Sequence, residues 1–288
     1  MADKHIAWEV LSKYVIYRRI KYLPTVRKIP DKLWNEIRLV LPPEKSNNTI
    51  GRPVIPYRKV LDGILYVLIT GCQWKMLPKE YGSGSTTCHR RFQEWVLSNV
   101  FQKLWVRLLK LYDDLRGIKW TWQSPDSISV KAPLGVGKWL VGPNPTTDRG
   151  KSGTKRHVLV DQKGIPLSVT ITGANIHDDM KASINTLDKI VVHKPVEKHN
   201  LCLDKGYDFP EVERESIKRR YVPHIRHRGE VLMKVKYSAR RWIVERTNSW
   251  WHNRFRKLLI RYEKKSENYL ALVCLACCII VYRRIILG

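Results

Sequence analysis

Apolar residues along the chain follow two different spacings, and the change between them falls near Trp120. Over residues 29–115 they recur at three- and four-residue intervals, as Val60, Ile64 and Val67 do. Such spacing places apolar side chains on one face of a helix. Pro and Gly residues separate the apolar segments and mark the turns between them. The first part of the chain is therefore predicted to be all helical.

Beyond Trp120 the apolar residues alternate with a period of two, which indicates β-strands. The run Asp161-Gln-Lys-Gly164 has the composition of a turn between two antiparallel strands. The predicted strands are 128–130, 157–160, 167–171, 200–203 and 221–225. The predicted helices are 178–190, 210–219 and a long one from about Ser238. The order of three strands, helix, strand, helix, strand, helix predicts a mixed α/β domain.

The two spacings divide the chain into three predicted segments. Residues 1–28 form an N-terminal extension, residues 29–117 a helical domain and residues 118–288 the mixed α/β domain. Length alone also favours two domains for a chain of 288 residues.

A helix, a turn and then a basic helix follow one another within the helical domain, an arrangement related to helix-turn-helix DNA-binding motifs. The last of these helices carries His89, Arg90 and Arg91 beside Phe92 and Trp95. Arg90 and Arg91 are therefore candidate DNA contacts. The same composition also fits an ordinary amphipathic helix with a solvated basic face, and both interpretations stay open.

The charge balance strengthens the expectation of a polyanionic partner. Lys and Arg number 53 against 26 Asp and Glu, which gives a formal net charge of +27. Nucleic acid is the leading partner, with scattered surface charge or an acidic membrane as alternatives. No apolar stretch of the secretory type follows the first residues, and the apolar run 270–282 is short of the roughly 20 residues that span a bilayer. We therefore expect a cytoplasmic protein with a buried C-terminal helix, no membrane partner and no chemical role for its cysteines.

Three carboxylates suit a metal centre in this basic chain. Asp126 begins the first predicted strand, Asp204 ends a later one, and Glu245 lies on the last long helix. Mg²⁺ and Mn²⁺ prefer such oxygen ligands, and two ions about 3.5–4 Å apart can cut a phosphodiester. Each residue also has a plain explanation, as a turn residue, a strand-end residue and an ion-pair partner of Arg241 respectively. Spacing alone leaves this choice open.

The segments around these three residues resemble the DDE transposases of bacterial insertion sequences, in the IS-five-like group. The matching runs are Asp126-Ser-Ile-Ser-Val-Lys-Ala-Pro-Leu-Gly135, Leu201-Cys-Leu-Asp-Lys-Gly-Tyr-Asp208 and Arg240-Arg-Trp-Ile-Val-Glu-Arg-Thr247. Further matches are Gly142-Pro-Asn-Pro, Lys155-Arg-His157 and Ala174-Asn-Ile-His-Asp178, together with Gly51-Arg-Pro and Gly71-Cys-Gln-Trp-Lys-Met-Leu-Pro78 in the helical half.

The resemblance implies a ribonuclease-H-like mixed sheet flanked by helices, preceded by the helical DNA-binding domain. It also implies that Asp126, Asp204 and Glu245 are catalytic and hold two Mg²⁺ or Mn²⁺ ions. The expected activity is recognition of terminal inverted repeats, metal-dependent strand cleavage and strand transfer. The partners are double-stranded DNA, as transposon ends and target, and further copies of the chain in a dimer or higher synaptic assembly. DNA binding would place the cytoplasmic protein on the bacterial nucleoid.

The resemblance also implies roles for further residues, although in less detail. Expected phosphate contacts are Lys151, Lys155, Arg156, Arg241 and Arg254, and supporting residues are His177, Tyr237 and His252. Compared with the family pattern, one extra residue stands near Thr147 and another near Trp251. An extra residue in a helix turns the following side chains by roughly 100°. The alternative function is therefore a catalytically decayed transposase that binds DNA as a repressor.

Overall fold

A computed structural model describes residues 28–44, 54–81, 85–135, 140–143, 150–176, 179–225 and 241–287. Its helical part contains α2 (Asp31–Ile37), α3 (Tyr57–Thr70), α4 (Ser85–Leu97) and α5 (Val100–Arg116), with the short helices η2 (Trp74–Met76) and η3 (Lys79–Tyr81) between α3 and α4. Gly71, with a φ of 73°, ends α3 in the left-handed conformation that glycine adopts readily. The all-helical character predicted for this part is confirmed.

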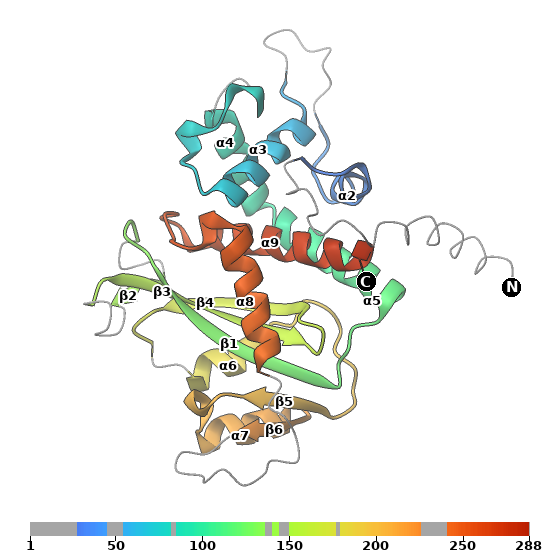
Figure 1. Cartoon of the computed structure of the whole chain (residues 1–288), viewed down its shortest axis with the longest axis vertical. Helices are drawn as coiled ribbons and strands as arrows, with labels where there is room; N and C mark the ends of the chain where they lie inside the picture. The colour runs from blue at the N-terminus through green and yellow to red at the C-terminus, as the bar shows by residue number, and fades with distance from the viewer. Residues whose placement is uncertain are drawn as a thin grey trace, which may run out of the picture.

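A mixed sheet forms the centre of the remaining chain (Figure 1). It contains β1 (Trp122–Lys131), β2 (Gly142–Pro143), β3 (Ser152–Asp161), β4 (Pro166–Gly173), β5 (His199–Leu203) and β6 (Tyr221–Ile225). Strand β3 pairs antiparallel with β1, β2 and β4, whereas β5 pairs parallel with both β1 and β6. The core order β4-β3-β1-β5-β6 is the ribonuclease-H-like arrangement expected from the sequence.

The hairpin between β3 and β4 has the predicted turn. The Gly164 amide donates to the Asp161 carbonyl at 2.9 Å, and Gly164 has a φ of 82°. The Asp161 carboxylate accepts hydrogen bonds from the amides of Lys119, Lys163 and Ile165 at 3.0, 2.8 and 2.8 Å. Asp161 therefore has a structural role, which agrees with its interpretation as a turn residue.

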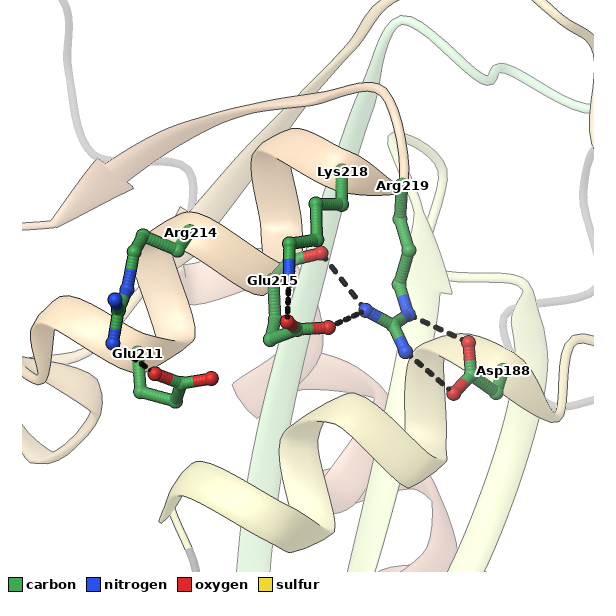
Figure 2. Close-up of polar contacts among 6 residues, drawn as sticks. All are labelled: Asp188, Glu211, Arg214, Glu215, Lys218 and Arg219. Carbon is green, nitrogen blue, oxygen red and sulfur yellow. Dashed lines mark hydrogen bonds and ion pairs between the residues drawn. The ribbon is translucent and has the colours of Figure 1, made fainter.

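Four helices cover the sheet: α6 (Asp179–Asp188), α7 (Pro210–Lys218), α8 (Trp242–Arg254) and α9 (Ser266–Leu287). Figure 1 shows α8 crossing the sheet in front of β1 and α6 behind it. Helix α7 is joined to α6 by Arg219, whose Nε lies 2.6 Å from Asp188 Oδ1 and whose Nη1 lies 2.5 Å from Glu215 Oε2 (Figure 2). Lys218 pairs with Glu215, and Arg214 with Glu211, on the same helix.

Helix α9 is longer than the apolar run that the sequence suggests. By length and hydropathy it could cross a membrane, but 67% of its apolar window is buried within the fold. It packs against α5 and β4. These contacts agree with the expected buried C-terminal helix. One hydrophobic core contains residues of the helical part and of the sheet, including Trp105 of α5, Leu159 of β3 and Leu272 of α9.

All six cysteines are free thiols. Cys72 is half-buried at the end of α3, and the other five are buried. Burial raises the pKa of Cys88 to about 11 and that of Cys274 to about 12. The five buried thiols act as small apolar groups of the core.

Candidate active site

Asp126 lies within β1, opposite Val158 of β3. On its other side β1 runs parallel to β5, with Trp122 opposite Asn200 and Gln123 opposite Leu201. Ser124 continues this register, because its hydroxyl donates to the Cys202 carbonyl at 3.2 Å. Asp126 therefore lies on a strand held firmly on both sides.

Asp204 follows the last residue of β5 directly and begins the short helix η5 (Lys205–Tyr207). Its Oδ1 accepts a hydrogen bond from the Lys205 amide at 2.7 Å. The offset between β1 and β5 is 200 − 122 = 78 residues, and the same offset separates Asp126 from Asp204. The two aspartates are therefore level with each other across neighbouring parallel strands.

Glu245 lies in the first turn of α8, which packs over β1 and β3. The guanidinium of Arg241 connects it to Asp204: Nη1 lies 2.7 Å from Asp204 Oδ1, and Nη2 lies 3.6 Å from Glu245 Oε1. The fold thus brings together three carboxylates that are far apart in the sequence. Arg241, expected as a phosphate contact, is engaged with two of them.

Asn248 completes this group, and the sequence did not point to it. Its Nδ2 donates to Asp126 Oδ2 at 2.8 Å. Its Oδ1 is buried and has no hydrogen-bond partner among the described residues. Residues three or four apart share one face of a helix, so Arg241, Glu245 and Asn248 all face the aspartates. That spacing is the only signal that the sequence contained.

Burial raises the pKa of the Asp126 carboxyl above its ordinary value, and the negative charge of Glu245 raises it further. The Ser127 amide, the charge of Arg241 and the Asn248 hydrogen bond act in the opposite direction. Burial therefore outweighs the groups that stabilise the carboxylate. An ionised Asp126 has more to gain from a nearby cation than an exposed aspartate has.

The donor set suits hard divalent cations, because it consists of carboxylate oxygens with the free amide oxygen of Asn248 beside them. Three carboxylates exceed the single charge of Arg241, so a negative field remains. Among the described residues, however, no group of three His, Cys, Asp or Glu side chains has metal-binding geometry. In this structure the cation that contacts Asp204 and Glu245 is the guanidinium of Arg241.

The expected DNA contacts fall into different environments. Arg90, Lys151 and Arg254 are exposed. Lys155 donates through Nζ to the Ile176 carbonyl at 3.2 Å, and Arg91 lies 2.6 Å from Glu94 Oε2. These five residues remain candidates, with Arg91 and Lys155 partly engaged within the protein.

Arg156 does not fit the expectation of a DNA contact. Its side chain is 1% exposed, with the guanidinium 4.4 Å from the centre of the Trp251 ring and Nη1 3.3 Å from the Tyr269 hydroxyl. Strand β3 is covered by α8 at this point, which directs Arg156 into the core. The prediction of a phosphate contact at Arg156 is wrong.

The supporting residues are tested only in part. His252 is half-buried near the end of α8, and burial together with the charge of Arg156 lowers its pKa. His177 and Tyr237 lie outside the described residues, as does the extra residue near Thr147. The extra residue near Trp251 does not interrupt α8, which is continuous from Trp242 to Arg254 with Trp251 fully buried.

Two family models match the chain. A model described as "Transposase DDE domain" covers residues 125–281, and a model described as "Putative transposase of IS4/5 family" covers residues 29–105. The two regions correspond to the sheet with its helices and to the helical part.

Two proteins of Burkholderia cepacia are similar in sequence. The "Putative transposase for insertion sequence element IS402" is 33% identical over 152 residues, 51% of this chain and 70% of that protein. The "Insertion element IS402 uncharacterized 16.2 kDa protein" is 38% identical over 115 residues, 39% of this chain and 78% of that protein.

Solved structures give a weaker likeness. The "Mos1 transposase paired-end complex with left transposon end" is 11% identical, covers 94% of this chain and 91% of its own, and has a TM-score of 0.27. The "Crystal structure of a pre-cleavage Mos1 transpososome" gives 10% identity, coverage of 95% and 90%, and a TM-score of 0.26. A likeness at these TM-scores supports no conclusion about the present chain.

Proposed function

The chain belongs to the DDE transposases of bacterial insertion sequences and is a DNA transposase; from this premise we propose that Asp126, Asp204 and Glu245 are its catalytic residues. The observation that carries the proposal is their convergence at one end of α8, where Arg241 contacts Asp204 and Glu245 while Asn248 contacts Asp126. Scattered structural acids would give no reason for one helix face to contact both Asp126 and Asp204, which come from different segments of the chain.

DDE transposase domains use divalent metal ions, and we propose two Mg²⁺ or Mn²⁺ ions held by these three carboxylates. When bound, such ions activate the attacking oxygen and neutralise charge at phosphorus. Asn248 orients Asp126, and the Lys205 amide orients Asp204. Arg241 pairs with Asp204 and Glu245; released from these pairs, its guanidinium would be free to contact a DNA phosphate.

The proposed substrate is double-stranded DNA carrying the terminal inverted repeats of the element. In the first step water attacks the phosphodiester at the element end and leaves a 3′ hydroxyl and a 5′ phosphate. In the second step that hydroxyl attacks a target phosphodiester, forms the new bond and releases a target 3′ hydroxyl. Two ends must meet, so we propose a dimer or higher assembly on DNA. Exposed Arg90, Lys151 and Arg254, with Lys155, are its proposed phosphate contacts, and the cytoplasm is its proposed compartment.

A decayed, purely DNA-binding transposase is not favoured. The family match covers residues 125–281, and the extra residue near Trp251 follows Glu245, so the rotation that it causes affects only the side chains after it.

The test is cleavage of a labelled duplex that carries the inverted repeat flanking the gene, with Mg²⁺ or Mn²⁺. We expect wild type to cut at the repeat end and Asp204→Asn and Glu245→Gln to lose cutting by at least 100-fold, as losses at a metal ligand do. Binding of the same duplex in Ca²⁺ should stay within a few-fold of wild type. Equal cutting by wild type and either variant would overturn the assignment of that residue.

A further inference from the structure

A ladder of alternating indole and guanidinium groups runs along α8 beside the carboxylates. The Arg246 guanidinium lies 4.8 Å from the centre of the Trp242 ring and 5.1 Å from that of Trp250. Arg284 of α9 lies 4.7 Å from the Trp250 ring. Trp250 therefore contacts one cation from its own helix and another from the C-terminal helix, which fixes α8 and α9 relative to each other.

Next to this ladder, α8 and α9 enclose a groove of about 180 Å³. Trp250, Arg254 and Phe255 line one side, and residues of α9 including Ile280, Arg283, Arg284 and Leu287 line the other. The described lining thus contains three arginines and no acidic residue. Within the described part of the chain, Arg254, Arg283 and Arg284 form no ion pair with a carboxylate.

The cations of this region are poorly compensated. Burial lowers the pKa of Arg246, and the nearby charge of Arg284 lowers it further. Asp161 acts on the pKa of Arg246 in the opposite direction. Its carboxylate is 1% exposed and already accepts three backbone amides. A bound anion would relieve this crowding of positive charge.

Helix α8 runs over β1 toward α9, which packs on α5 (Figure 1). Arg246 follows Glu245 on α8, so its side chain points about 100° around the helix from that of Glu245, and the ladder occupies a different face from the carboxylates. From Glu245 to Arg254 the helix rises about 14 Å, roughly four base pairs of duplex at 3.4 Å each. Nine residues make about two and a half helical turns, so Arg254 points away from the face that carries Glu245, and a duplex rather than a single strand would span both places.

We propose that the α8–α9 groove binds backbone phosphates of the duplex that the carboxylates cut, with Arg283 and Arg284 as its principal ligands. Arg254 was expected to contact DNA from the family resemblance, whereas Trp250, Arg246, Arg283 and Arg284 are new. The proposal rests on the proposed function, because it names a second contact for the same DNA. Charge complementarity selects phosphate: the site offers guanidinium groups that pair with phosphate oxygens.

The experiment measures binding of a labelled duplex with the flanking inverted repeat to the full chain in Ca²⁺, over a series of salt concentrations. Arg283→Ala/Arg284→Ala should weaken binding about 10-fold and reduce the slope of log K against log salt by roughly one to two, as losing one or two phosphate contacts does. Arg283→Ala alone leaves the Trp250 stack intact and should reduce the slope by about one. Arg283→Lys/Arg284→Lys keeps the charges and should recover most of the slope.

The matched control is Arg214→Ala/Lys218→Ala on α7, which removes the same charge from two residues already paired with Glu211 and Glu215 (Figure 2). Its slope should equal that of wild type. Unchanged slopes in both groove variants, or an equal loss in the control, would overturn the groove proposal. Lost binding to phosphatidylserine vesicles with unchanged DNA binding would also overturn it and indicate a lipid surface. Failure of the proposed function looks different, because wild type itself would then fail to cut the duplex in Mg²⁺ or Mn²⁺, whether or not it binds.

Discussion

Asn248 lies one helical turn beyond Glu245 and forms a hydrogen bond with Asp126, the most buried of the three carboxylates. Its amide nitrogen donates to Asp126 Oδ2, and its hydrogen bond lowers the pKa of Asp126 against the opposing effect of burial. The side chain touches no reacting atom that the structure shows, so Asn248 is a positioning residue. Its effect should appear in the ionisation of Asp126.

Asn248→Ala should therefore move the acid limb of the cleavage pH profile to higher pH. Without the hydrogen bond the pKa of Asp126 rises further, and protonation then competes with cation binding at a higher pH. At neutral pH we expect cleavage to fall about 10- to 100-fold, as for other groups that orient metal ligands. Asn253→Ala is the control, because Asn253 bonds only to exposed Ser249 on the same helix. A profile lowered in rate but unshifted in pH would contradict this role.

Asp126→Asn should stabilise the metal-free protein. The folded-state pKa of Asp126 is raised, so the folded chain binds this proton more tightly than the unfolded chain, and stability is lost as the pH rises through the folded pKa. An amide avoids this loss. In EDTA at pH 8 we expect Tm to rise by about 2–4 °C, equivalent to roughly 1 kcal/mol. The gain should shrink as the pH falls toward the ordinary aspartate range, and a constant gain would contradict the explanation.

At the scale of elements, α8 is held over the sheet by contacts with the β3–β4 hairpin. The Thr247 hydroxyl donates to the Gly164 carbonyl at 2.8 Å, and Arg246 Nη2 donates to the Lys163 carbonyl at 2.9 Å. Gly164 has a positive φ, and a Cβ there would lie 2.8 Å from Thr247 Oγ1. The hairpin turn therefore sets the distance between the sheet and α8, the helix that carries Glu245.

Gly164→Ala should push α8 away from the sheet. Backbone strain and the clash together are expected to cost about 1–3 kcal/mol and to reduce cleavage more than DNA binding. Gly150→Ala is the matched control: its φ is also positive, but a Cβ there meets no atom within 4 Å. It should show the strain alone. Thermal melts and cleavage rates of the two variants provide the comparison, and equal effects would exclude the clash with Thr247.

The elements themselves were largely accessible from the sequence. Strand β6 has the predicted bounds, and β5 ends at Leu203 with Asp204 next, because alternation and turn residues are local signals. The role of Arg156 was predicted wrongly and Asn248 was not predicted at all. Both roles depend on partners that are distant in the sequence. Lys155, Arg156 and His157 are consecutive polar residues, and only packing against Trp251 shows that Arg156 is buried. Asn248 acts on a residue 122 positions away.

For the whole molecule, the helical part and the sheet share a core at the contact between α5 and α9. Trp105 and Leu108 are buried in it, and the Cys278 thiol lies 3.7 Å from the Phe101 carbonyl. The domain boundary predicted at residue 117 stays a prediction. One hydrophobic core contains described residues from both sides of that position. We infer that the two regions stabilise each other.

The chain should consequently unfold in one transition. Leu108→Ala removes a fully buried side chain at this contact and should cost about 2–5 kcal/mol. Calorimetry should show a single peak that moves to lower temperature as a unit, and near-UV circular dichroism should follow it. Two peaks, with only the first moved by Leu108→Ala, would show that the regions unfold independently.

Because five of the six cysteines are buried, modification of their thiols reports when the folded protein opens. A thiol alkylates as its thiolate, and the five buried cysteines are both enclosed and, at Cys88 and Cys274, shifted to higher pKa. A maleimide added to the folded chain should therefore modify Cys72 first. The Cys72 carbonyl lies 3.5 Å from Lys257 Nζ, where α3 approaches the segment after α8. A single probe attached to Cys72 would follow movements between the helical part and the sheet on DNA. Slow modification of the five buried thiols would report how fast these two regions separate.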